Sequence, residues 1–173
     1  MKPLKMTTLA KNEIEVEREF NASAALLWRA MTEPELVKKW MNGQSDHSMP
    51  VCEMDVRVGG KLRLVWHMPQ GEMAMQGEFR NVEAPTFLVH SEVFDDWPDN
   101  SSLVTQTLRE NGDTTLLTVL IAYDNEKARD AVLRTGIETG MENCYGNLDA
   151  LLVELLSSEA ERAAATNQRH PDI

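Results

Sequence analysis

The feature that most constrains the fold is an apolar stripe near the C-terminus. Apolar side chains recur there at steps of three and four residues: Met141, Cys144, Tyr145, Leu148, Leu151, Leu152 and Leu155. This spacing places them on one face of an α-helix. With Asp124 or Asn125 as its cap, the predicted helix extends to about Leu156. Such a helix must bury its apolar face against another layer, and a concave sheet is a layer that fits it.

The preceding residues predict that sheet. Apolar and charged residues alternate from Glu13 to Phe20, as expected of an antiparallel strand with one buried face. Asn111-Gly112 is a strong hairpin signal between two further strands. The alternation predicts later strands at about 52–58, 62–66, 73–80, 87–94, 103–110 and 114–123.

Two short helices are expected between the first and second strands. Ser23 can cap the first, and Thr32-Glu33-Pro34-Glu35 has the form of a capping box that opens the second. Strands separated from helices and linked by hairpins predict the α+β class rather than βαβ winding. We therefore expect a curved antiparallel sheet of about seven strands, two short helices and one long C-terminal helix.

The length of 173 residues suits a single domain. The pattern predicts an N-terminal extension at 1–12, the folded domain at 13–157 and a flexible tail at 158–173.

Composition narrows the range of partners. The net charge of −11, with no basic stripe, argues against binding to nucleic acid. No apolar run reaches the roughly 18 residues of a membrane span, and the N-terminus does not resemble a signal peptide. Cys52 and Cys144 are isolated, which fits a reducing compartment. We expect a soluble cytoplasmic protein that does not bind a membrane; the sequence leaves open whether it forms a homodimer.

Motifs for catalysis and for metal binding are lacking. The four histidines, His47, His67, His90 and His170, show no spacing typical of a metal site. No serine lies in a Gly-x-Ser-x-Gly elbow. The sequence therefore favours a protein without catalytic residues, metal or cofactor, although it does not decide whether the protein is an enzyme.

His90 and Glu92 stand out because they share a strand face with Leu88 and Phe94. If that face points inward, the two residues are polar anchors within an apolar pocket. If it points outward, Val89 and Val93 fill the core in their place.

The order of these motifs resembles the START-like SRPBCC superfamily. Within it, the chain is most similar to the branch named after homology to activators of the 90-kDa heat-shock chaperone ATPase. The resemblance covers about residues 13–156. It rests on Val16–Phe20, Trp28, Thr32–Leu36, Trp40, Val58–Arg63, Gly77, Ala84-Pro85, Leu88-Val89, Thr139–Glu142, Tyr145, Leu148, Asp149 and Leu151-Leu152. Tyr145 departs from the tryptophan of many relatives.

The resemblance implies a helix-grip fold with a pocket between the sheet and the long helix. Members of the superfamily bind lipids, sterols, hormones or polyketides, and some are cyclases or carry metal centres. Our main hypothesis is that the chain binds a small hydrophobic molecule. The alternatives are a chaperone-associated module that stimulates the 90-kDa chaperone ATPase, or a cyclase or hydrolase that uses His90 or Glu92. The residues expected to line the pocket are Trp40, Met41, Trp66, Met75, Phe79, His90, Phe94, Met141 and Tyr145.

The helical stripe gives two further expectations. Met141 and Tyr145 should face the sheet, while Glu138, Glu142 and Asp149 should face solvent. Gly136 and Gly140 are costly within a helix. Close approach of the sheet is the favoured reason for them, and room for a ligand is the alternative.

Overall fold

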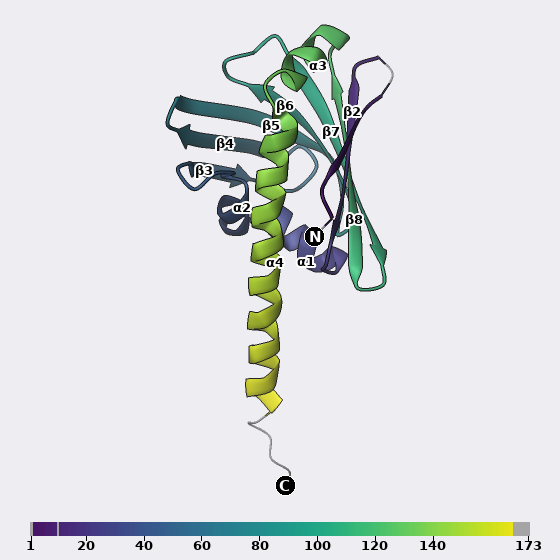
Figure 1. The fold of residues 1–173 in the computed structure, drawn as a ribbon, viewed down its shortest axis with the longest axis vertical. Coiled ribbons are helices and arrows are strands. Elements are labelled where there is room, and N and C mark those ends of the chain that lie inside the picture. The colour runs from purple at the N-terminus through teal and green to yellow at the C-terminus, as the bar shows by residue number, and fades with distance from the viewer. Residues whose placement is uncertain (1, 10, 168–173) are drawn as a thin grey trace.

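The computed structural model describes residues 2–9 and 11–167, which form one antiparallel sheet and a set of helices (Figure 1). The strands are β1 (Lys5–Thr8), β2 (Glu13–Phe20), β3 (Ser48–Met54), β4 (Lys61–Met68), β5 (Gly71–Glu83), β6 (Phe87–Phe94), β7 (Ser101–Asn111) and β8 (Thr114–Tyr123). The helices are α1 (Ala24–Thr32), α2 (Pro34–Trp40), α3 (Glu126–Leu133) and α4 (Ile137–Asn167).

The sheet has the strand order β1-β2-β8-β7-β6-β5-β4-β3, with every neighbouring pair antiparallel. It curves around α4, which crosses its concave side and extends well beyond it (Figure 1). The helices α1 and α2 lie against each other, α2 beside β3 and both in contact with α4. The predicted α+β helix-grip architecture is confirmed.

Alternation along the strands builds the core. On β2, Ile14, Val16 and Phe20 are buried completely and belong to the core cluster that also holds residues of α4. The helix contributes Tyr145 and Leu148 from its apolar stripe, so the predicted helical register is correct here. Tyr145 packs edge-on against Phe20, with ring centroids 5.6 Å apart.

The strand β1 was not predicted. It lies within the segment expected to be an extension, and it pairs with β2 through contacts such as Met6 with Val16. Leu4 is buried beside it, and the Leu4 backbone N–H donates to Glu142 Oε2 at 2.8 Å. Four residues are too few to show a clear alternation, which is why the sequence pattern misses this edge strand.

The C-terminal segment differs from the single helix that we expected. It breaks at Gly136, which adopts φ 81° between α3 and α4. The Asn125 side chain caps α3 by accepting from Ala128 N at 2.9 Å. The helix α4 does not end near Leu156 but continues to Asn167, so the described part of the expected tail is helical. Despite the length of α4, no helix among the described residues is apolar enough to cross a membrane.

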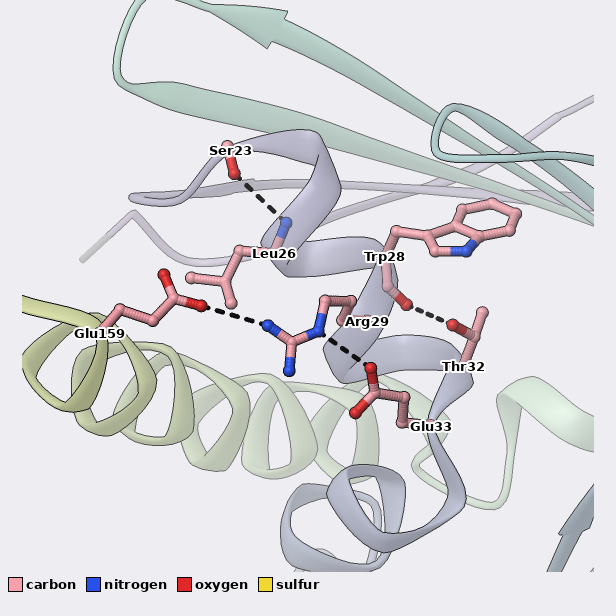
Figure 2. Close-up of polar contacts among 7 residues, drawn as sticks. All are labelled: Ser23, Leu26, Trp28, Arg29, Thr32, Glu33 and Glu159. Atoms are coloured by element: carbon pink, nitrogen blue, oxygen red, sulfur yellow. Dashed lines mark hydrogen bonds and ion pairs between the residues drawn. The ribbon is translucent and has the colours of Figure 1, made fainter. Parts of the chain in front are cut away.

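Figure 2 shows how α1 begins and ends. Ser23 caps it as predicted, because its hydroxyl accepts from Leu26 N at 3.2 Å. The expected capping box does not form: the Thr32 hydroxyl donates to the Trp28 carbonyl at 2.7 Å instead. Glu33 is the cap of α2 but makes no side-chain capping bond.

The carboxylate of Glu33 is occupied by Arg29, whose Nε lies 2.9 Å from Glu33 Oε1. The same guanidinium reaches Glu159 on α4 at 3.1 Å (Figure 2). Arg29 therefore links the C-terminal part of α4 to α1. Glu35, the glutamate of the expected capping box, instead accepts from Lys38 Nζ at 3.2 Å.

Candidate functional site

The concave side of the sheet holds a small, mostly apolar cavity of about 50 Å³. Its walls come from α1, α2 with the residue that follows it, and strands β3 to β7; no residue of α4 lines it. The expected position between the sheet and the C-terminal helix is therefore corrected to one between the sheet and the α1–α2 pair. Four methionines share the lining: Met31, Met41, Met54 and Met75.

The cavity is small compared with ordinary ligand sites, which enclose about 300–1,000 Å³. A ligand larger than a few waters can enter only if lining side chains move. Methionine suits that demand because its unbranched chain has three rotatable bonds and a polarizable sulfur. A ligand could therefore bind in this cavity only if the cavity expanded.

The polar part of the lining comes from β6, and it decides between the two orientations left open by the sequence. Leu88 and His90 are buried on the concave face, and both line the cavity together with Glu92. His90 is only 6% exposed, and its ring lies 5.8 Å from the Phe79 ring. The inward orientation is confirmed.

His90 and Glu92 form a hydrogen-bonded pair, with 2.8 Å between Nε2 and Oε1. The second ring nitrogen, Nδ1, is buried and has no hydrogen-bond partner among the described residues. A buried polar atom without a partner costs about 1–3 kcal/mol. Beside a cavity, such an atom is expected to form a hydrogen bond with a water molecule or a ligand group. Gln106 is the third polar residue of the lining and lies opposite Leu88 on β7.

Two buried phenols lie near this polar end. Glu92 pairs in register with Ser102 on β7, which pairs with Tyr123 on β8. Burial raises the pKa of Tyr123, and the Glu92 charge raises it further. Burial likewise raises the pKa of Tyr145, with a smaller contribution from Glu92. Both phenols therefore stay neutral at physiological pH.

Arg18 is a functional-looking residue that the sequence analysis missed. It is 2% exposed and lies on the concave face of β2, between Val16 and Phe20. Its Nη2 donates to Asp149 Oδ2 at 2.5 Å, and its Nη1 lies 3.6 Å from Glu142 Oε1. The alternation of β2 could have identified Arg18, since every second residue from Ile14 points inward.

Arg18 also corrects the predicted solvent face of α4. Glu138 is exposed as expected, but the Asp149 side chain is only 14% exposed and Glu142 contacts both Arg18 and Leu4. Burial raises the pKa of Asp149, and the Arg18 charge offsets part of that rise. The acidic residues hold α4 against β1 and β2, so they do not simply solvate the helix.

The residues predicted to line the pocket divide into two groups. Trp40, Met41, Met75, Phe79 and His90 surround the cavity. Their role in binding a ligand remains a prediction.

The other predicted lining residues lie elsewhere. The indole of Trp66 donates to the Met41 carbonyl at 2.9 Å and supports the wall from outside the lining. Tyr145 fills the core beside Phe20, and Phe94 and Met141 are partly buried at the edges of the core. Strand and helix periodicity identify the inward face but not which part of it borders the cavity.

The helix glycines do not mark close packing. A Cβ added at Gly140 would meet no atom within 4 Å, so the expected approach of the sheet is wrong. Gly136 is needed for a different reason, because its positive φ closes α3 before α4 begins.

A larger hollow of about 310 Å³ lies on the surface between residues 42–45 and α4. Most of its lining residues are polar, and Lys39 and Glu154 pair across it at 3.5 Å. Asn147 donates to the Gly43 carbonyl at 2.7 Å, so this backbone acceptor of the loop already has a hydrogen-bond partner. This hollow is open to solvent and lacks the orphaned polar atom of the interior cavity, so we take the interior cavity as the candidate site.

Groups suited to metal binding or nucleophilic attack do not cluster in the described part of the chain. No three His, Cys, Asp or Glu side chains there could hold a metal ion together. Burial raises the pKa of both Cys52 and Cys144 to about 11. The thiolate is the reactive form of cysteine, and neither residue forms it readily at neutral pH.

Residues 21–153 match the family described as Activator of Hsp90 ATPase homolog 1-like protein. The chain belongs to this family. The match covers α1 to most of the packed part of α4, which includes the whole lining of the cavity.

Solved structures are also similar to this member of the Hsp90-activator-like family. A protein from Rhodobacter sphaeroides is 32% identical, with a TM-score of 0.82 over 88% of this chain and 99% of its own. CalU16 from Micromonospora echinospora is 25% identical, with a TM-score of 0.59 over 94% and 92%. A protein from Mycobacterium smegmatis shares the fold at 24% identity, with a TM-score of 0.77 over 87% and 97%. No curated protein matches the chain.

Proposed function

We propose that this member of the Hsp90-activator-like family binds a small apolar molecule in the cavity between the sheet and the α1–α2 pair. The observation that carries the proposal is the composition of the lining. Methionine, leucine and aromatic side chains surround a single His90–Glu92 pair with an unsatisfied nitrogen. An apolar pocket with a few fixed polar groups is typical of a small-molecule site.

The wall formed by α2 supports this proposal. Trp40 is held by its indole N–H, which donates to the Ala30 carbonyl at 2.9 Å. Met41 follows at the end of α2, where the helix gives way to a loop. A fixed indole beside an adaptable thioether combines a stable surface with one that can move aside for a ligand.

Thermal unfolding tests the proposal. A ligand that binds only the native state raises the midpoint by mass action. We expect compact aromatic and alicyclic compounds to raise it for the wild-type protein. A Leu64→Phe variant, which adds volume to the lining, should lose the response, whereas Gly146→Ala on α4 should keep it. The absence of any shift across diverse apolar compounds would contradict the proposal.

A second candidate function is contact with a 90-kDa chaperone, which the family's description favours. The surface available for it includes Val153 and Leu156 on α4, which are 65% and 43% exposed. Stimulation of the chaperone ATPase by the wild-type protein, lost in a Val153→Glu/Leu156→Glu variant, would support this function. A chaperone ATPase rate unchanged by the wild-type protein would exclude it.

A further inference from the structure

The polar end of the cavity restricts the chemistry of the ligand more than its apolar walls do. His90 Nε2 is already committed to Glu92 Oε1 at 2.8 Å. An ionised carboxylate only accepts hydrogen bonds, so Nε2 must carry the proton of this pair. The nitrogen left for a ligand is Nδ1, which is buried and has no partner among the residues described.

The two protonation states of His90 make opposite demands at Nδ1. In the neutral ring Nδ1 is an acceptor, and in the imidazolium it is a donor. A hydroxyl can donate or accept, so it satisfies Nδ1 in either state. A ketone or an ether satisfies only the imidazolium, and a hydrocarbon leaves Nδ1 unpaired in both.

The surrounding charges disfavour an anionic ligand. Glu92 belongs to the same lining, so a carboxylate or phosphate at Nδ1 would face another negative charge. The buried cation Arg18 is not part of the lining and is paired with Asp149 and Glu142. Burying an anion that lacks a compensating cation is costly.

From this arrangement we infer that the ligand is a neutral apolar alcohol or phenol whose hydroxyl hydrogen-bonds to His90 Nδ1. This inference rests on the proposed function and specifies the class of molecule bound at the same site. The methionine-rich lining takes the apolar body, and the β6 pair takes the hydroxyl.

Three matched probes test the inference by calorimetry: naphthalene, 2-naphthol and 2-naphthoate, which share one ring system. One neutral hydrogen bond corresponds to a roughly 2- to 12-fold gain in affinity. We therefore expect the wild-type protein to bind 2-naphthol tighter than naphthalene by roughly that factor, and to bind 2-naphthoate most weakly.

Two variants test whether the preference for 2-naphthol over naphthalene depends on His90. His90→Phe should reduce the ratio of 2-naphthol to naphthalene affinity to about 1, because the hydrogen bond accounts for the whole gain. His67→Phe is the matched control, since His67 also pairs with a glutamate, Glu72 at 2.9 Å, but on the exposed surface. It should keep the wild-type ratio. If His90→Phe does not fold, the ¹⁵N resonance of His90 Nδ1 in the wild-type protein gives the same answer, moving with 2-naphthol and not with naphthalene.

The outcomes separate this inference from the proposal beneath it. Equal binding of naphthalene and 2-naphthol, or tighter binding of 2-naphthoate, would overturn the hydroxyl assignment and leave apolar binding intact. Binding of none of the three to the wild-type protein would overturn both.

Discussion

Arg18 shows how one buried charge organises the contact between sheet and helix. It lies among apolar neighbours on β2, with Phe20 5.5 Å from its guanidinium carbon, and its Nε has no partner among the described residues. Removing one partner of a buried ion pair is far more damaging than replacing both, because a lone charge then stays buried. Arg18 and Asp149 therefore stabilise the protein chiefly because each charge compensates the burial of the other.

Asp149→Ala should destabilise the protein by about 3–5 kcal/mol, because Arg18 then keeps only the distant Glu142. The double variant Arg18→Met/Asp149→Leu should recover most of that loss. Urea denaturation measures both. Glu138→Ala, on the exposed face of α4, is the control and should change stability by less than about 0.5 kcal/mol. A double variant as unstable as Asp149→Ala would show that the pair is not compensated in this way.

Cys52 and Cys144 should react slowly with a disulfide reagent. Burial raises both thiol pKa values to about 11, so only about one thiol in 1,000 is ionised at pH 8. The rate should rise about tenfold per pH unit until it levels near pH 11. Spectrophotometric thiol titration checks this, with the urea-unfolded protein as the reactive control. A native rate equal to the unfolded rate at pH 8 would contradict the burial of both thiols.

At the scale of elements, the sequence predicts well those features that are repeated along many residues. The α4 register and the alternation of β2 and β8 follow from such repeats. Single positions were harder, because Gly136 has the same appearance in the sequence whether it lies inside a helix or ends one. The capping box at 32–35 failed because the Thr32 hydroxyl bonds back to the Trp28 carbonyl and Glu35 pairs with Lys38, contacts that form only on the folded helices.

The glycines around the α3–α4 break should respond in opposite directions to alanine. Gly140 has open space around a new Cβ, so Gly140→Ala should stabilise the protein by about 1 kcal/mol through helix propensity. Gly136 has φ 81°, so Gly136→Ala should destabilise it by about 1–2 kcal/mol. Thermal melts of the two variants check the pair, each serving as the control for the other. A lower melting point for Gly140→Ala would point to a contact that the open space does not show.

At the scale of the whole molecule, the core divides into two clusters. One joins β2, β7 and β8 to α1 and α4, and the other joins β3 to β6 with α2. The cavity adjoins mainly the second cluster. Sequence periodicity identified most residues of both clusters, but it could not show that the second leaves space, because that depends on the separation between α2 and the sheet.

This division predicts in which elements ligand binding will slow amide hydrogen exchange. Amide exchange reports local opening, which is rarest where strands are packed on both edges and the core is full. In the free protein, amides near Leu117 on β8 should exchange most slowly, since β8 lies between β2 and β7. Adding 2-naphthol should slow exchange on β4 to β6 and on α2, because native-state binding suppresses openings that expose the site.

Hydrogen exchange followed by mass spectrometry measures the elements of both core clusters in one experiment. The cluster that contains β2 and β8 serves as the internal control, because it contributes little to the cavity lining. Leu64→Phe, which reduces the cavity, should abolish the ligand-dependent slowing on β4 to β6 while the pattern on β8 stays the same. Slowing confined to α4 and residues 42–45 would instead place the ligand in the surface hollow, and the methionine-lined cavity would then be only a gap in the core.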